Sequence, residues 1–266
     1  MKKIEKIAKW IRHETPLRKA GFLWDGLRQM YRKILSVAYP EGLARNINRT
    51  DLIYVDHCWT SLPEVYEKEV WPEVMRRLET ASLFVDVGGH MGLYAVCGAK
   101  RMPAGGKVVV FEPQSENARF LHRTVQLNHV EDKVQIREAA VGEKTGIICI
   151  SPGQSQATIS ESEGIPVKMT SLDAEFPSER IDVLKIDVEG AEEKVLQGAE
   201  EVLASKIRRP HSIFIEVHPY NWKIFKTTSD TLVQRLIKHG YQLRRLDGKP
   251  LGKIEFYGEI LAEIPK

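Results

Sequence analysis

Cysteine is scarce in this sequence, and long apolar runs are absent. The chain of 266 residues holds three cysteines, Cys58, Cys97 and Cys149, which lie far apart and form no Cys-x-x-Cys pair. This spacing argues against a disulfide framework and gives no sign of a structural zinc site. No apolar stretch approaches the roughly 18 to 20 residues that cross a bilayer, and the N-terminus lacks the continuous apolar core of a secretion signal. We therefore expect a cytoplasmic protein in a reducing compartment.

The length and composition predict one domain with an appendage. Hydrophobic side chains make up 42% of the 266 residues, so the chain can bury a full core. The segment 39–51 is rich in turn-forming residues and separates two parts of different composition. We divide the chain into a basic helical arm with its lead-in, residues 1–63, and a main domain, residues 64–266.

The net charge of +3 is unevenly distributed. Residues 1–33 carry ten Lys or Arg and three acids, a net charge of +7, which leaves −4 for the rest of the chain. Ile4, Ile7 and Ile11 recur at helical spacing beside lysines, which predicts a basic amphipathic helix pair. Such helices pack on their own domain or on a twin subunit of a homo-oligomer, or they dock on an anionic membrane surface, here the inner face. The acidic main body makes nucleic acid an unexpected partner.

From residue 83 onward, apolar runs of strand length alternate with helical patterns. This alternation predicts an α/β fold with helices on both faces of a mostly parallel sheet. The turn at 247–252 is too short for a helical crossover, so the last strand should be antiparallel. The predicted strands are 83–87, 107–112, 134–138, 182–187, 211–217, 241–246 and 255–262. The predicted helices are 61–79, 92–101, 115–128, 190–204 and 229–239.

The segment 142–176 breaks this alternation. It combines short predicted strands at 147–150 and 165–169 with a loop rich in Ser and Gln. We expect a β-excursion near the rim of the ligand pocket.

The stretch 83–96, LFVDVGGHMGLYAV, runs from a strand through a glycine turn into a helix. In an open α/β sheet this junction forms a crevice where glycines let the backbone approach a ligand. A dinucleotide fingerprint needs glycines at i, i+2 and i+5, but counting back from Gly92 the first position is Val87. This disfavours a nicotinamide-dependent dehydrogenase. The pattern that fits is Asp-x-Gly-x-x-x-Gly, and the residues of the turn are Asp86, Gly88, Gly89, His90 and Gly92.

Acids at the ends of the first two strands predict S-adenosylmethionine as the cofactor. Asp86 can accept a hydrogen bond from the ammonium group of an amino-acid tail. Glu112, twenty residues after Gly92, can accept from both ribose hydroxyls. At the end of the third strand, Glu138 should lie near the exocyclic amine of adenine. The other residues that we expect at the cofactor are Pro113, Ala139, Ala140 and Asp187.

Two further strands carry charges that a central strand seldom tolerates unless they are paired or functional. Lys185 and Asp187 lie on the strand of "VLKIDVEG", and Glu216 and His218 share one face of "IFIEVHP". If these strands are adjacent, Lys185 can pair with Glu216 inside the sheet. Asp187 and His218 would then lie at the mouth where ligands bind.

His218 is the candidate general base, because its ordinary pKa near 6.5 suits proton abstraction at neutral pH. The alternative is that His218 donates a hydrogen bond to Asp187 and orders the sheet edge. Asp187 is expected to contact the ligand or to orient His218. Glu189 is expected to contact the ligand, to orient His218 or to cap the following helix. A carboxylate and a histidine at one mouth could instead hold a divalent cation that binds vicinal sugar hydroxyls.

Five segments resemble the FkbM family of S-adenosylmethionine-dependent methyltransferases, in the same order and with similar spacing. The resemblance covers roughly residues 64–262, and its specific part is Lys-Ile-Asp-Val-Glu-Gly at 185–190. The family commonly has Gly-Ala-Asn-x-Gly where this chain has Gly-Gly-His-Met-Gly, at 88–92. The segments are FVDVGGHMGLYA, VVVFEPQSENARFLHRTVQLN, REAAVGEKTG, VLKIDVEGAEEKVLQGAEEVL and IFIEVHP.

The resemblance implies a Rossmann-like class I methyltransferase fold with a seven-strand sheet. It also implies methyl transfer to a hydroxyl of a sugar, glycan or related natural product. Two alternatives from other classes are the nicotinamide-dependent dehydrogenase and a non-catalytic membrane-surface module in which the basic arm is the functional part.

Overall fold

One large sheet organises the protein. The computed structural model describes residues 21–59, 62–150, 159–160 and 164–265, so the predicted helix around Ile4, Ile7 and Ile11 lies outside the described residues. The strands of the large sheet are β3 (Leu83–Val87), β4 (Lys107–Phe111), β5 (Val134–Arg137), β10 (Val183–Ile186), β11 (Ser212–Val217), β12 (Gln242–Arg245) and β13 (Gly258–Glu263).

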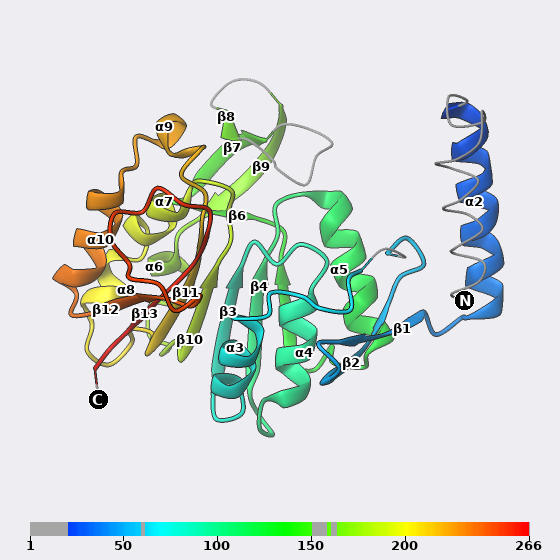
Figure 1. The fold of residues 1–266 in the computed structure, drawn as a ribbon, viewed down its shortest axis with the longest axis horizontal. Coiled ribbons are helices and arrows are strands. Elements are labelled where there is room, and N and C mark those ends of the chain that lie inside the picture. Colours follow the sequence, from blue (N-terminus) through cyan, green and yellow to red (C-terminus); the bar gives the residue numbers. More distant parts are fainter. Residues whose placement is uncertain (1–20, 60–61, 151–158, 161–163, 266) are drawn as a thin grey trace.

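These seven strands lie in the order β12-β13-β11-β10-β3-β4-β5 (Figure 1). The pairs from β11 to β5 are parallel, whereas β13 enters between β11 and β12 and is antiparallel to both. The predicted class, a mostly parallel seven-strand sheet with an antiparallel last strand, is confirmed.

Helices cover both faces of the sheet. Alternate residues of each strand point to opposite sides, so each face contributes to a separate buried cluster. Phe84 and Val110 belong to one buried cluster, and their neighbours Val85 and Phe111 belong to the other. The helices of the first cluster are α3 (Trp71–Leu78), α4 (Leu93–Arg101) and α5 (Ser115–Leu127). Those of the second are α6 (Leu172–Glu175), α7 (Glu192–Gln197), α8 (Glu200–Ala204), α9 (Trp222–Phe225) and α10 (Ser229–Lys238).

The helix predicted at 190–204 is divided into α7 and α8. A Cβ on Gly198 would lie 1.9 Å from the carbonyl oxygen of Gly142, so only glycine lets these two segments meet. The carboxylate of Asp173 then accepts hydrogen bonds from the backbone N–H groups of Glu201 and Val202, at 3.0 and 2.8 Å. A side chain distant in sequence therefore caps α8, which a local pattern does not reveal.

The helix predicted at 61–79 is limited to α3. Glu67 has a positive φ of 39°, which is incompatible with a continuous helix. Pro72 lies in the first turn of α3, where its fixed φ favours a helix start.

The segment predicted as a turn-rich boundary forms most of a hairpin of β1 (Leu43–Ile47) and β2 (Asp51–Val55). Leu43, Ile47 and Val55 are buried in the same cluster as Phe84 of the sheet. The division at residue 63 stays a prediction, but this hairpin packs into the core of the main domain.

A second sheet forms the predicted β-excursion. Its strands lie in the order β6-β9-β7-β8, and the predicted strands at 147–150 and 165–169 correspond to β7 and β9. The bounds of the four are β6 (Ala140–Val141), β7 (Gly146–Ile150), β8 (Ile159–Ser160) and β9 (Ile165–Thr170).

The helix α2 (Gly21–Ala38) stands at the edge of the molecule, beyond α5 and the hairpin (Figure 1). Leu35 packs into the core, whereas Met30, Ile34 and Val37 are exposed. Among the described helices, none combines the length and the apolar character needed to cross a membrane.

Asp51 joins the hairpin to the main domain. Its carboxylate accepts from the indole N–H of Trp71 at 2.9 Å and from Nε of Arg101 at 2.7 Å. Burial alone would raise the pKa of Asp51, but hydrogen bonds from Arg101, Trp71 and Thr50 outweigh it and lower the pKa.

We expect Asp51→Asn to lower the free energy of unfolding by about 1–3 kcal/mol at pH 7, since it removes the charge of a buried acceptor. A carboxylate with a lowered pKa stabilises the fold above its unfolded-state pKa and loses this effect as it is protonated. The difference from the wild type should therefore shrink below about pH 4. Denaturant unfolding at pH 7 and pH 3.5 measures this difference in the free energy of unfolding, with Asp132→Asn on an exposed turn as the control. An equal loss of stability in Asp51→Asn at both pH values would contradict the expectation.

Candidate active site

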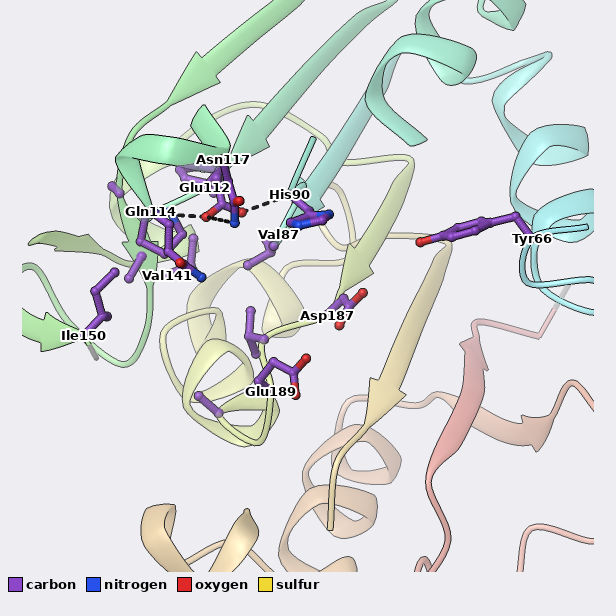
Figure 2. A pocket seen from close by; sticks show the side chains of 17 residues that line it. Tyr66, Val87, His90, Glu112, Gln114, Asn117, Val141, Ile150, Asp187 and Glu189 are labelled. Atoms are coloured by element: carbon purple, nitrogen blue, oxygen red, sulfur yellow. Dashed lines mark hydrogen bonds between the residues drawn. The ribbon is translucent and has the colours of Figure 1, made fainter. Parts of the chain in front are cut away.

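A cavity of about 230 Å³ opens at the carboxyl ends of β3, β4 and β10. Glu112 lies on one side of it, and Asp187 and Glu189 lie on the other (Figure 2). Ile150 of the β-excursion also lines the cavity, in agreement with the predicted position of the excursion near the pocket rim. In open α/β sheets, the carboxyl ends of the strands form the ligand-binding crevice.

The structure brings most of the predicted cofactor residues to this cavity, but not all of them. Asp86 and Gly89 line a smaller neighbouring cavity of about 30 Å³, and Gly92 lines neither. Glu138 is not among the lining residues either; its carboxylate faces His122 at 3.2 Å. The predicted cofactor residues that line the larger cavity are Gly88, His90, Glu112, Pro113, Ala139, Ala140 and Asp187.

Glu112 is a buried carboxylate that is fixed by its surroundings. Its Oε2 accepts from the backbone N–H of His90 at 2.9 Å, and its Oε1 accepts from that of Gln114 at 2.8 Å (Figure 2). Asn117 on α5 contacts the same oxygen at 3.4 Å. Burial raises the pKa of Glu112 to about 7 in spite of these hydrogen bonds. Each oxygen retains lone pairs for further donors at the cavity wall.

The glycine turn allows the backbone segments after β3 and β10 to lie in close contact. Gly88 has φ +89°, and a Cβ there would lie 1.8 Å from the carbonyl oxygen of Asp187. Only glycine fits this position. His90 has φ 49°, a region in which Asn, Asp and His are the commonest residues other than glycine. This explains how His90 can stand where the family commonly has asparagine.

Asp86 is buried beneath the turn. Its Oδ2 has no hydrogen-bond partner among the described residues. Burial raises the pKa of Asp86 to about 7, although the nearby Lys185 ammonium opposes the shift. An acceptor oxygen of this kind, next to the glycine turn, fits a ligand that brings a donor such as an ammonium group.

The predicted pairing of Lys185 with Glu216 is wrong. β10 and β11 are adjacent, but their register places Phe214, not Glu216, beside Lys185. The buried Lys185 donates instead to Oδ2 of Asp187 at 3.1 Å. Glu216 lies further toward the carboxyl end and accepts from the hydroxyl of Tyr257.

His218 is buried, with 1% of its surface exposed. Its Nδ1 lies 2.7 Å from Oε1 of Glu192. Its Nε2 lies 3.6 Å from Glu189, 3.8 Å from Glu216 and 3.9 Å from Asp187. A hydrogen bond between His218 and Asp187, the predicted structural alternative, is therefore not formed at this distance.

Four carboxylates surround the imidazole of His218. Burial alone would lower its pKa, but the hydrogen bond and charge of Glu192, with the charges of Asp187 and Glu189, outweigh burial and raise the pKa above its ordinary value. In the same cluster, burial raises the pKa of Glu216 to about 8.

Sequence reasoning missed Glu192, which has no exposed surface. An acid in the first turn of a helix is ordinary, because it interacts favourably with the helix dipole. Nothing in the pattern "GAEEKVL" separates Glu192 from Glu193. Tyr257, whose hydroxyl reaches Glu216, was missed because the sequence placed it inside the predicted strand 255–262, whereas β13 begins one residue later, at Gly258.

The arrangement could also hold a cation. Asp187, Glu216 and His218 offer ligand atoms that lie within 4.8 Å of one another. Carboxylate and imidazole groups are suitable ligands for several divalent ions, so the cation alternative raised by the sequence stays open.

The sheet order and the carboxyl-end cavity define a class I methyltransferase fold. Residues 86–243, more than half of the chain, match the family described as "Methyltransferase FkbM domain". The chain belongs to this family, so the predicted class, an S-adenosylmethionine-dependent methyltransferase, is confirmed in place of the dehydrogenase.

Two curated proteins are similar to this chain at about one quarter sequence identity. The chain is 25% identical to methyltransferase sdnD of Sordaria araneosa, over 56% of this chain and 67% of that protein. It is 24% identical to the AMB antimetabolite synthetase AmbE of Pseudomonas aeruginosa, over 79% of this chain but only 12% of that protein.

Two solved structures are among those that match this chain at low identity. The methyltransferase FkbM from Methylobacillus flagellatus KT has a TM-score of 0.46 and 16% identity, over 69% of this chain and 43% of that one. An O-methyltransferase from Bacillus cereus, solved in complex with SAH, has a TM-score of 0.42 and 16% identity, over 74% and 80% of the two chains.

Proposed function

We propose that this protein transfers the methyl group of S-adenosylmethionine to a hydroxyl of a sugar, a glycan or a related small natural product. The observation that carries the proposal is the pair of groups across one cavity. The fixed carboxylate of Glu112 lies on one side, and the carboxylates of Asp187 and Glu189, with His218 behind them, lie on the other.

Glu112 and the glycine turn would hold the cofactor. Glu112 would accept hydrogen bonds from the ribose hydroxyls, because its oxygens are already fixed at the cavity wall. Asp86 would accept from the ammonium group through its unpartnered Oδ2. Ala139 and Ala140 present small side chains along the cavity where a flat ring could lie.

The acceptor would bind beside Asp187, Glu189 and His218. When bound, the cofactor supplies a methyl group that its sulfonium already activates. The protein's task is to hold the acceptor oxygen in line, where positioning can contribute up to about 7–11 kcal/mol, and to remove its proton. His218 is the proposed base, since a well-placed base contributes about 10²–10⁴ in rate.

Aromatic rings beside the base support a sugar-like acceptor. Tyr220 and Tyr257 are exposed, and their rings flank that of His218 at 5.7 and 5.3 Å. Exposed rings next to carboxylates suit a molecule with both apolar faces and hydroxyl groups. The nearby Trp222 is buried in the core and does not contribute to this exposed surface.

We expect Glu112→Gln to weaken cofactor binding by about 10- to 100-fold, because it loses a charged acceptor of two hydrogen bonds. Since the pKa of Glu112 is raised to about 7, the wild-type affinity should increase from pH 6 to pH 8, as the carboxylate loses its proton. The variant should show a smaller increase. Calorimetric titration tests this, with Glu116→Gln on the exposed first turn of α5 as the control; unchanged affinity in Glu112→Gln would remove Glu112 from the site.

Replacement of the base should slow turnover without weakening cofactor binding. We expect His218→Gln to lower kcat by about 10²–10⁴. The wild-type rate should increase with pH through a midpoint above 6.5, since the pKa of His218 is raised and the base acts without its proton. Initial rates with hydroxylated acceptors measure both kcat and the pH midpoint, with the surface variant His122→Asn as the control. Loss of activity in EDTA that a divalent ion restores would favour the cation alternative over the base.

We also propose that the N-terminal arm binds an anionic membrane surface. Met30, Ile34 and Val37 form an exposed apolar stripe on one face of α2, and the net charge of residues 1–33 is +7. The pairing of apolar side chains with basic charge is typical of helices that lie at the headgroup region.

The arm is tested by co-sedimentation with lipid vesicles. We expect binding to vesicles that contain phosphatidylserine, little binding to neutral vesicles, and a decrease at high salt because the attraction is screened. Ile34→Ser with Val37→Ser should weaken binding several-fold, whereas Leu52→Ser, exposed on the hairpin, should not. Equal binding of both variants would contradict the role of the stripe.

A further inference from the structure

Glu192 lies at the start of α7 and is surrounded by hydrogen-bond donors. Its Oε1 accepts from the backbone N–H groups of Gly190 at 3.0 Å and His218 at 3.2 Å, and it faces Nδ1 of His218 at 2.7 Å. Its Oε2 accepts from the indole N–H of Trp222 at 2.8 Å. The carboxylate is thereby fixed from three segments of the chain and cannot turn away from His218.

This contact decides which nitrogen of His218 carries the proton. An ionised carboxylate can only accept, so Nδ1 keeps its hydrogen when the ring is neutral. The lone pair is then on Nε2. Nε2 faces Asp187 and Glu189, the two acids that line the cavity. The rings of Tyr220 and Tyr257 contact the imidazole from the outside and restrict its rotation.

We propose that Glu192 is a positioning residue for methyl transfer, which holds His218 as the Nδ1–H tautomer and directs Nε2 toward the acceptor oxygen. The inference rests on the proposed function. As the acceptor oxygen bonds to the methyl carbon, the carbon–sulfur bond breaks and its electron pair stays on sulfur. The acceptor proton passes to Nε2, and Glu192 stabilises the imidazolium that forms.

A purely structural role explains the contact less well. A carboxylate without exposed surface must lose its hydration, and apolar side chains of similar volume are often as stabilising in such places. The neighbouring Glu193 is also buried, but it accepts from the hydroxyl of Thr231 on α10 at 2.6 Å, pairs with Arg235 at 3.4 Å and does not line the cavity. Glu193 is therefore a matched control for the loss of a buried carboxylate on the same helix.

The charge of Glu192 also sets the pH at which His218 acts. The other groups that face the imidazole are Asp187 and Glu189 before α7, Glu216 on β11, and the hydroxyl-bearing rings of Tyr220 and Tyr257. Neutralising Glu192 leaves these groups in place. The midpoint of the pH–rate profile should then move to lower pH, because one negative charge no longer stabilises the imidazolium.

The test compares Glu192→Gln with Glu193→Gln in the full chain. In Glu192→Gln we expect kcat to fall about 10- to 100-fold, the midpoint of kcat against pH to fall, and cofactor affinity to stay within twofold of the wild type. Glu193→Gln should leave the midpoint unchanged. Equal midpoints in the wild type and Glu192→Gln, or equal shifts in both variants, would overturn the proposal.

A spectroscopic measurement keeps the proposal testable if Glu192→Gln does not fold. In the wild type with ¹⁵N-labelled histidine, NMR spectra above the pKa of His218 should show a protonated Nδ1 and an unprotonated Nε2. The opposite tautomer would overturn the role of Glu192. Absence of cofactor binding by the wild type would instead refute the proposed function, and calorimetry detects this separately.

Discussion

The close approach of Gly88 to the backbone of Asp187 is the constraint on which the site depends. It joins the ends of β3 and β10, so that the turn after one strand and the acids after the other border a single cavity. A side chain at Gly88 would separate these strand ends. Glu112, His90 and Asp187 share one cavity because a glycine at position 88 lets the two backbone segments approach this closely.

Much of the fold could be predicted because its signals are local. Apolar runs marked the strands, and the short turn after β12 required an antiparallel partner. The division of the helix predicted at 190–204 arose from contacts distant in sequence. Asp173 caps α8 and Gly198 meets Gly142, which divides one predicted helix into two.

The candidate site was predictable in its strand ends but not in its pairings. Glu112 and Asp187 were found because acids at strand ends are conspicuous. The partner of Lys185 depends on strand register, which a single sequence does not specify when both faces are buried. Glu192 looked like an ordinary helix-start acid, and Glu138 looked like a ligand although its carboxylate turns toward His122. For Glu192 and Glu138, burial and the direction of the side chain decided the role, and neither can be read from the sequence.

The insertion of β13 between β11 and β12 affects the order in which the two sides of the site can form during synthesis. The strands around Glu112 need only residues up to about 141, so a nascent chain can assemble them early. The contact between Tyr257 and Glu216 requires translation to pass residue 257, and β11 has no neighbour on its outer edge until β13 has emerged. The side of the site that holds His218, Glu216 and Tyr257 is therefore the part that the ribosome completes last among the described strands, and an exposed edge of β11 precedes it.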